Sequence, residues 1–308
     1  MPLEIDLPDD DEQLSLEEYV ERLEQQHYDL SDQNDLIASA PYLKKLGNNK
    51  DFLIDQMFNE LKDCLQFQEA NIYAPEVLIL HRTNDYFIRA NIWKPVTKVE
   101  EQVPGYRYDV CHDHNFDILT IGYLGPGYQC RAYTYDSNAC IGILGEKVDL
   151  RTERLFTLSE GKVALYRAKR DVHIQLPPER ISVSINLIPK GAARNEPQLQ
   201  FDESSGRITR YLNFSGTEAV LRLAGLVGSH EYLDVLARIA DQHPNPKIRA
   251  LALVAQMRIA AERTDAIQAN INGSQPPLVR HIVESEMTSY GSCLKTVDIE
   301  PEESYLQS

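Results

Sequence analysis

A series of short apolar segments between residues 77 and 214 constrains the fold of this chain most strongly. Each segment is about five to ten residues long, the usual length of a strand, and Gly, Pro, Asn or Asp separates it from the next. The first two segments, in "EVLILHRTNDYFIRANIWKP", are divided by "TND" and should form a hairpin. The spacing predicts an antiparallel barrel or a double-sheet jelly roll. The other expected strands are HNFDILTIGYLG, YQCRAYTYD, CIGILGEKVDL, RLFTLSEG, KVALYRAKRDVHIQL, ISVSINLI and GRITRYLNF.

Helical patterns precede these strands. "SLEEYVERLEQQHYDL" opens with Ser15, and Glu18 follows three residues later, which is the pattern of a capping box. "DFLIDQMFNELKDCLQF" has apolar residues at a helical period and should be amphipathic. The sequence up to about residue 70 therefore reads as helical.

A helical period returns near Ser215. The piece "HPNPKIRALALVAQMRIA" resembles the helical hairpins of HEAT repeats, although too few copies are visible for a long solenoid. An ordinary helical bundle packed on the β domain is the alternative. We divide the chain into a helical region 1–76, a β domain 77–214, a HEAT-like helical region 215–290 and a disordered tail 291–308.

Charge and composition exclude several classes of function. The net charge of −16 argues against nucleic acid and against an anionic membrane surface as partners. The chain has no run of about 18 apolar residues and no signal-peptide pattern at its acidic start, so we expect a cytoplasmic protein. The five cysteines form no CxxC pair, which fits free thiols.

Two histidines in "DVCHDHNFDILTIGYLG" raise the question of a metal site. Side chains alternate along a strand, so His112 and His114 should share one face, and Cys111 should point away. Neutral imidazole is a common ligand of transition metals. His173 in "DVHIQLPPERISVSINL" is a third candidate ligand. Alternatively, the pair marks a solvated strand end and His173 is a buried structural histidine. Of the remaining histidines, only His81 is close enough in the pattern to act on the site.

The order of these motifs resembles the cupin superfamily, and within it the thiol dioxygenase branch typified by cysteine dioxygenase. The resemblance covers roughly residues 77–214 and is carried by "FIRANIWKP", "CHDHNFDILTIGYLG", "DVHIQLPPERISVSINLI" and "QFDESSGRITRYLNF". It implies a cupin double-stranded β-helix, a jelly-roll barrel, here flanked by helices at both ends. It also implies that His112, His114 and His173 hold Fe(II).

Four positions depart from the family's pattern or test it. Many cupins carry an acidic fourth metal ligand, and Asp117 is the candidate here, although only a bulge would turn it toward the histidines. Leu119 and Ile188 stand where the family's crosslinked cysteine and tyrosine would be, and Asn186 replaces a histidine. Asn186 can still donate a hydrogen bond to substrate or dioxygen. We therefore expect that free cysteine is not the preferred substrate.

A residue that binds the substrate is expected on the hairpin that precedes the strand of His112 and His114. The resemblance implies an arginine from this region, either Arg82 or Arg89, that holds a substrate carboxylate. Arg131, Tyr133 and Tyr135 share one strand face, which either lines the pocket or faces outward.

The leading hypothesis is a mononuclear non-heme iron oxygenase that acts on dioxygen and a small molecule, such as a thiol or an amino-acid derivative. One alternative is a non-catalytic cupin that senses a ligand or metal while its helical C-terminus binds a protein partner. The other is an isomerase or hydrolase that uses Zn, Mn or Ni on the same histidines.

Overall fold

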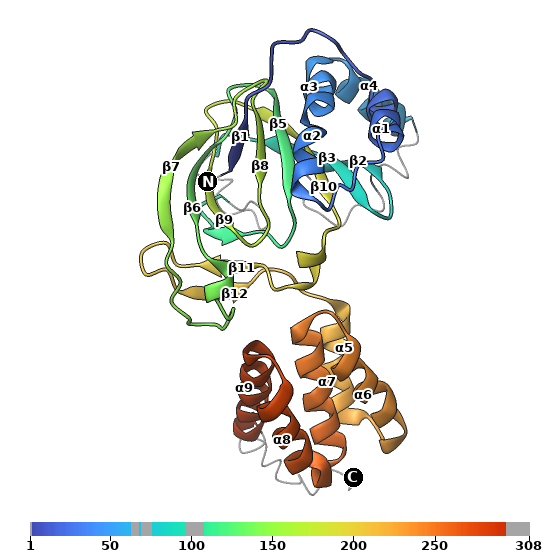
Figure 1. The fold of residues 1–308 in the computed structure, drawn as a ribbon, viewed down its shortest axis with the longest axis vertical. Coiled ribbons are helices and arrows are strands. Elements are labelled where there is room, and N and C mark those ends of the chain that lie inside the picture. The colour runs from blue at the N-terminus through green and yellow to red at the C-terminus, as the bar shows by residue number, and fades with distance from the viewer. Residues whose placement is uncertain (1, 63–67, 69–75, 97–107, 294–308) are drawn as a thin grey trace, which may run out of the picture. The chain divides into compact units, whose positions relative to one another are not determined.

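The computed structural model describes residues 2–62, 68, 76–96 and 108–293. The chain divides into two compact units, residues 1–212 and 213–308 (Figure 1). Among the described residues, no helix has the length and apolar character needed to span a bilayer. Each unit is described by itself below.

The first unit contains two antiparallel sheets of six strands each. The described strands thus form two separate sheets, and the closed barrel that we expected is not found among them. The first sheet has the order β1-β8-β5-β10-β3-β2 and the second has the order β12-β11-β4-β9-β6-β7. The first sheet consists of β1 (Leu3–Ile5), β2 (Val77–Arg82), β3 (Tyr86–Trp93), β5 (Ile118–Leu124), β8 (Val163–Tyr166) and β10 (Ser182–Pro189). The second consists of β4 (His112–Asp113), β6 (Gln129–Thr134), β7 (Arg151–Thr157), β9 (Asp171–Leu176), β11 (Leu199–Phe201) and β12 (Ile208–Tyr211).

The two sheets pack face to face around a shared apolar cluster, and Figure 1 shows them as two layers. Strand β10 illustrates how one sequence serves two cores. Ile188 points into the space between the sheets, whereas Ile185 and Leu187 point to the outer face. The strand is buried on both faces, but "ISVSINLI" alternates instead of forming a continuous apolar run, because Ser184 and Asn186 share the inner face with Ile188.

Helices from the N-terminal region cover the outer face of the first sheet. They are α1 (Leu16–Gln25), α2 (Gln33–Ala38), α3 (Ala40–Asn48) and α4 (Phe52–Leu61). The predicted capping box is confirmed, because Ser15 accepts from the backbone of Glu18 and the Glu18 carboxylate accepts from the backbone of Ser15. Helix α3 lies so close to β5 that a Cβ on Gly47 would come within 2.5 Å of Ile121.

Two expectations for this unit are wrong. The N-terminal region is not wholly helical, because β1 pairs with β8 at the edge of the first sheet. The segment "CIGILGEKVDL" is a loop rather than a strand. In this loop the Glu146 carboxylate accepts hydrogen bonds from the backbone N–H groups of Ile141, Gly142 and Ile143. Gly142 has a φ of 86°, a conformation that interrupts a strand.

The second unit is helical, as expected. Helix α7 contacts α5, α6 and α9, and most of its residues are buried, among them the polar Lys247 and Gln256. Asn245 caps α7 and Pro246 occupies its first turn. The expected tail from residue 291 lies largely outside the described residues, since α9 runs to Cys293 and 294–308 are not described. The helices are α5 (Gly216–Val227), α6 (Leu233–Gln242), α7 (Pro246–Ile259), α8 (Thr264–Ser274) and α9 (Pro277–Cys293).

Candidate metal centre

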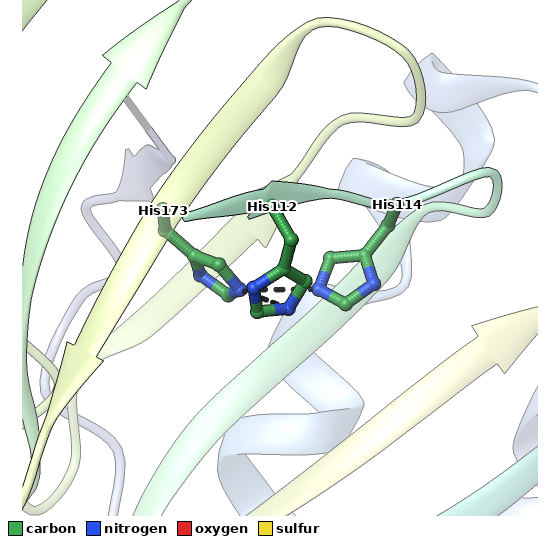
Figure 2. A group of neighbouring side chains, drawn as sticks. All are labelled: His112, His114 and His173. Atoms are coloured by element: carbon green, nitrogen blue, oxygen red, sulfur yellow. Dashed lines mark hydrogen bonds between the residues drawn. The ribbon is translucent and has the colours of Figure 1, made fainter. Parts of the chain in front are cut away.

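Three histidines of the second sheet bring their ring nitrogens together. His112 lies on β4 and pairs with His173 on the neighbouring strand β9, while His114 follows directly after β4. Figure 2 shows the three rings converging on one point. The Nε2 atom of His173 lies 3.2 Å from Nε2 of His112 and 3.2 Å from Nε2 of His114. All candidate ligand atoms of the group lie within 4.8 Å of one another.

The three histidines are buried, with exposed fractions of 7%, 9% and 2% for His112, His114 and His173. Burial holds the pKa of His114 well below its ordinary value, and the neighbouring His112 and His173 lower it further. Burial and His112 lower the pKa of His173 in the same way. Both imidazoles are therefore neutral near pH 7, which is the form that binds a metal.

Hydrogen bonds at the opposite ring nitrogens fix two of the rings. The Nδ1 atom of His112 lies 2.8 Å from the carbonyl oxygen of Val110, so Nδ1 carries a proton, and in the neutral ring Nε2 then has the lone pair. The side-chain amide of Gln198 lies 3.3 Å from Nδ1 of His114. The Nδ1 atom of His173 has no hydrogen-bond partner in the described part of the chain. Its ring packs instead on the Tyr166 ring, with centroids 4.8 Å apart.

The protons available do not account for the close contacts between the Nε2 atoms. In the neutral form of His112 the proton is on Nδ1, so only a proton on Nε2 of His173 could bridge these two atoms. The amide nitrogen of Gln198 at Nδ1 of His114 favours a proton on Nε2 of that ring, and this proton can bridge His114 and His173, but it leaves the lone pairs of His112 and His173 facing each other. A cation bound by all three Nε2 atoms would satisfy them at once, with the proton of each ring on Nδ1. The donor set, three neutral imidazoles, suits a first-row transition metal.

Aromatic rings and a thiol surround the histidines on the inner face. The Phe116 ring lies 5.0 Å from the His114 ring. The Tyr166 hydroxyl is 3.1 Å from the Tyr128 hydroxyl and 3.5 Å from the Cys130 sulfur. Burial raises the pKa of the Cys130 thiol to about 11, so this side chain stays protonated near pH 7. These groups make a largely apolar wall beside the ring nitrogens.

The inner face of the first sheet carries a row of polar side chains. The Asn186 amide accepts a hydrogen bond of 2.7 Å from Thr120 and lies 3.3 Å from the side-chain oxygen of Asn91. Arg89 lies directly opposite Asn186 on the neighbouring strand. It is two residues from Phe87, which packs between the sheets, so Arg89 faces the same side. The positive charge of Arg89 also lowers the pKa of His114, which places it near the histidine group.

Several predicted site residues lie away from the histidines. Arg82 is exposed at the end of β2, unlike Arg89. Asp117 is not part of the group, because its carboxylate accepts hydrogen bonds from the backbone of Ala168 and the side chain of Gln33. Asp117 lies just before β5, after a bend at residues 115–116, and the register of β5 with β8 has no bulge at this position. Leu119 points to the outer face, against the N-terminal helices.

The outer face of the second sheet holds the residues whose orientation was open. Cys111, Tyr133 and Tyr135 pack in an outer apolar cluster, so none of them lines the inner face. Arg131 pairs with Glu203 on that same side. His81 packs near the Tyr86 ring, which belongs to the core under the helices, and so it does not act on the histidine group.

Sequence reasoning missed three residues around the site. Tyr166 and Gln198 touch the histidines, but both come from segments whose pairing cannot be read locally. Asp113 stands between His112 and His114 in the motif itself. Because side chains alternate along a strand, Asp113 points to the face opposite the two histidines, and its hydrogen-bond partners on that face come from distant segments.

No family model matches this chain, and no curated protein matches it. The chain is similar to the crystal structure of hydroquinone 1,2-dioxygenase from Sphingomonas sp. TTNP3 with 4-hydroxybenzoate bound, at 12% identity over 40% of this chain and 71% of that one, with a TM-score of 0.26. It is also similar to a prolyl 4-hydroxylase structure from Phytophthora capsici, at 12% identity over 89% of this chain and 83% of that one, with a TM-score of 0.23. Scores this low carry no argument about fold or function. What the fold and site define is a two-sheet β protein with a buried group of three histidines.

Proposed function

We propose that this chain is a mononuclear non-heme iron oxygenase with a cupin-type β unit, in which His112, His114 and His173 hold Fe(II). The convergence of the three Nε2 atoms is the observation that carries the proposal. Three uncharged ligands would leave the ion its full charge, and the bound metal would supply the site at which dioxygen and a small substrate react.

The polar row opposite the histidines gives the proposed substrate its orientation. Arg89 is the proposed anchor for an anionic group, because a guanidinium binds a carboxylate through two parallel hydrogen bonds. Asn186 is held by Thr120 and offers its amide next to that anchor. The aromatic rings of Phe116 and Tyr166 exclude water from the side of the site where they pack.

The proposed substrate is a small thiol or amino-acid derivative with more apolar surface than cysteine. Ile188 is buried in the cluster between the sheets, at a position where the resembling enzymes have a tyrosine. An apolar side chain there offers no donor to a small zwitterion, and a site with few donors discriminates weakly in favour of such a substrate.

Metal analysis combined with oxygen uptake tests the proposal. Protein reconstituted with Fe(II) without air should retain about one iron per chain, and His173→Ala should lose most of it because one of three protein ligands is gone. Oxygen uptake is then measured with cysteine, cysteamine, 3-mercaptopropionate and bulkier analogues. Efficient turnover of free cysteine would contradict the substrate assignment. Tight binding of Zn, Mn or Ni with isomerase or hydrolase activity, or bound metal without turnover, would favour the alternative functions.

Arg89 and Arg82 form a matched pair for the anchor, since both lie on the same hairpin, but Arg89 is half-buried opposite Asn186 whereas Arg82 is exposed at the end of the edge strand β2. Arg89→Met should raise the KM for an anionic substrate by roughly tenfold or more, which corresponds to loss of a charge-assisted hydrogen bond. Arg82→Met should leave the KM unchanged. Equal effects of the two substitutions would remove Arg89 from the proposed site.

A further inference from the structure

Asp113, the residue between His112 and His114, is a buried carboxylate that accepts three hydrogen bonds. It has an exposed fraction of 0% and points to the face opposite the histidines. Its Oδ2 atom accepts hydrogen bonds from the Tyr135 hydroxyl at 2.7 Å and from the Lys169 ammonium at 2.8 Å. Its Oδ1 atom accepts from the backbone N–H of Leu199 at 2.6 Å. Each donor comes from a different segment of the chain.

Strand β4 needs such support because it is short. It consists of His112 and Asp113 alone, and the chain leaves the sheet at His114. Its ladder pairs His112 with His173 on one side and with Gln200 on the other. Two residues of ladder are a weak constraint on the ring positions, whereas metal ligands must be held closely to be effective.

The turn at Lys169, which leads into β9, is bonded to the segment that carries His112 and His114. The backbone N–H of Lys169 donates to the carbonyl oxygen of His114 at 2.8 Å. Its ammonium bridges Asp113 and the carbonyl oxygen of Pro197, also at 2.8 Å. Lys169 has a φ of 54°, a conformation that residues other than glycine rarely adopt. The buried ion pair with Asp113 gives a physical reason for a lysine in that conformation.

The hydrogen bond from the backbone of Leu199 to Asp113 also positions Gln198, which contacts His114. Leu199 begins β11, and the preceding residue is Gln198, whose amide lies 3.3 Å from Nδ1 of His114. By holding the backbone of Leu199, the Asp113 carboxylate keeps Gln198 in reach of that ring. The same carboxylate thus acts on His114 from both sides, through the Lys169 turn and through Gln198.

We infer that Asp113 is a positioning residue that sets the geometry of the His112 and His114 rings for the metal, through its bonds to Tyr135, Lys169 and Leu199. This inference rests on the proposed function, because it concerns the same metal site. Outer residues that orient metal ligands typically change metal affinity by about 10-fold to 100-fold when they are replaced.

The experiment uses Co(II) as the probe on the full chain and compares three substitutions. Asp113→Asn removes the charge, and Tyr135→Phe removes one donor while keeping the ion pair with Lys169. Tyr211→Phe is the control, since Tyr211 lies in the same outer cluster but donates to the carbonyl oxygen of Gly142, away from β4. The readouts are the Co(II) dissociation constant, the visible spectrum of bound Co(II), and the histidine ring NMR signals of the metal-free protein.

We expect Asp113→Asn to weaken Co(II) binding by about tenfold or more, with an altered Co(II) spectrum and shifted ring signals of His114. Tyr135→Phe should move the same readouts in the same direction, and it decides the matter if Asp113→Asn does not fold. Tyr211→Phe should match the parent. Affinity, spectrum and ring signals that match the parent in the deciding variant would overturn the inference. A parent that binds neither Co(II) nor Fe(II) would instead overturn the proposed function, and with it the metal-directed role of Asp113.

Discussion

Acidification of the metal-free protein should destabilise the β unit in a pH range where ordinary carboxyl groups do not yet titrate. His114 and His173 have pKa values well below 6.5 in the folded chain because both are buried among imidazoles. In the unfolded chain their pKa returns to about 6.5. The unfolded state therefore binds more protons at acid pH. The stabilising contribution of these groups is present above about pH 6.5 and is lost as the pH falls toward the folded pKa values.

The size of this effect has an upper limit. Each group that is protonated only on unfolding changes the free energy of unfolding by about 1.4 kcal/mol per pH unit. Between about pH 6.5 and pH 5, each histidine thus contributes at most about 2 kcal/mol, and the pair at most about 4 kcal/mol. For a unit of this size, 1 kcal/mol corresponds to a Tm shift of about 2–4 °C. A fall of several degrees in Tm is therefore expected.

The chain offers a selective signal for this measurement. Trp93 is the one tryptophan of the sequence, and it lies on β3 in the β unit. Its fluorescence during unfolding in the presence of EDTA reports on the β unit and not on the helical unit. The double variant His114→Gln/His173→Gln should flatten the pH dependence. The double variant still contains Asp117, whose pKa is raised by burial. Asp117 therefore stabilises the folded state as the pH falls, whereas the two histidines destabilise it. A parent whose stability does not change between about pH 6.5 and pH 5 would refute the reasoning.

Two further predictions concern the fold. Gly127→Ala should cost roughly 3 kcal/mol, since the residue has a φ of 82° and a Cβ would come within 2.0 Å of the Leu158 carbonyl oxygen. Gly161→Ala is the control, because Gly161 has a φ of 77° but open space around it, and this substitution should cost only about 1 kcal/mol. Both free energies of unfolding are measured by urea titration. Equal costs would show that the close contact at Gly127 is unimportant. In the helical unit, Lys247→Met should cost about 3 kcal/mol because it leaves the buried Glu218 carboxylate without the partner that lies at 2.7 Å. Far-UV circular dichroism should then show that adding Glu218→Leu restores most of the stability, whereas no recovery would mean that packing of the lysine stem dominates.

The alternation of side chains along a strand was enough to predict the local arrangement of the histidine motif. The alternation of side chains placed His112 and His114 on one face and Cys111 on the other, and the structure has this arrangement. Only the pairing of β4 with β9 brings His173 to the same point. That pairing is a long-range register, for which the sequence alone gives no local signal. The resemblance of the motif order to that of cupins is what suggested it.

The errors arose where a distant partner or a single turn overrides a local pattern. The acidic N-terminal segment has little strand character of its own, and β1 exists because the edge of β8 is available to it. The segment after Cys140 is apolar enough for a strand, but Gly142 and the Glu146 carboxylate hold its backbone in a loop. Asp113 could be assigned to the outer face by parity, yet nothing in the sequence indicates its bond to Lys169.

X-ray absorption spectroscopy of the Fe(II)-loaded parent tests the central claim most directly, because it reports the ligands of the metal themselves. With His112, His114 and His173 as the ligands, we expect about one iron per chain, with nitrogen and oxygen ligands only and with the scattering of three imidazole rings. The His173→Ala variant, if it retains iron at all, should show two. Sulfur in the first shell, or a parent iron spectrum without imidazole scattering, would contradict the assignment of His112, His114 and His173 as the metal ligands.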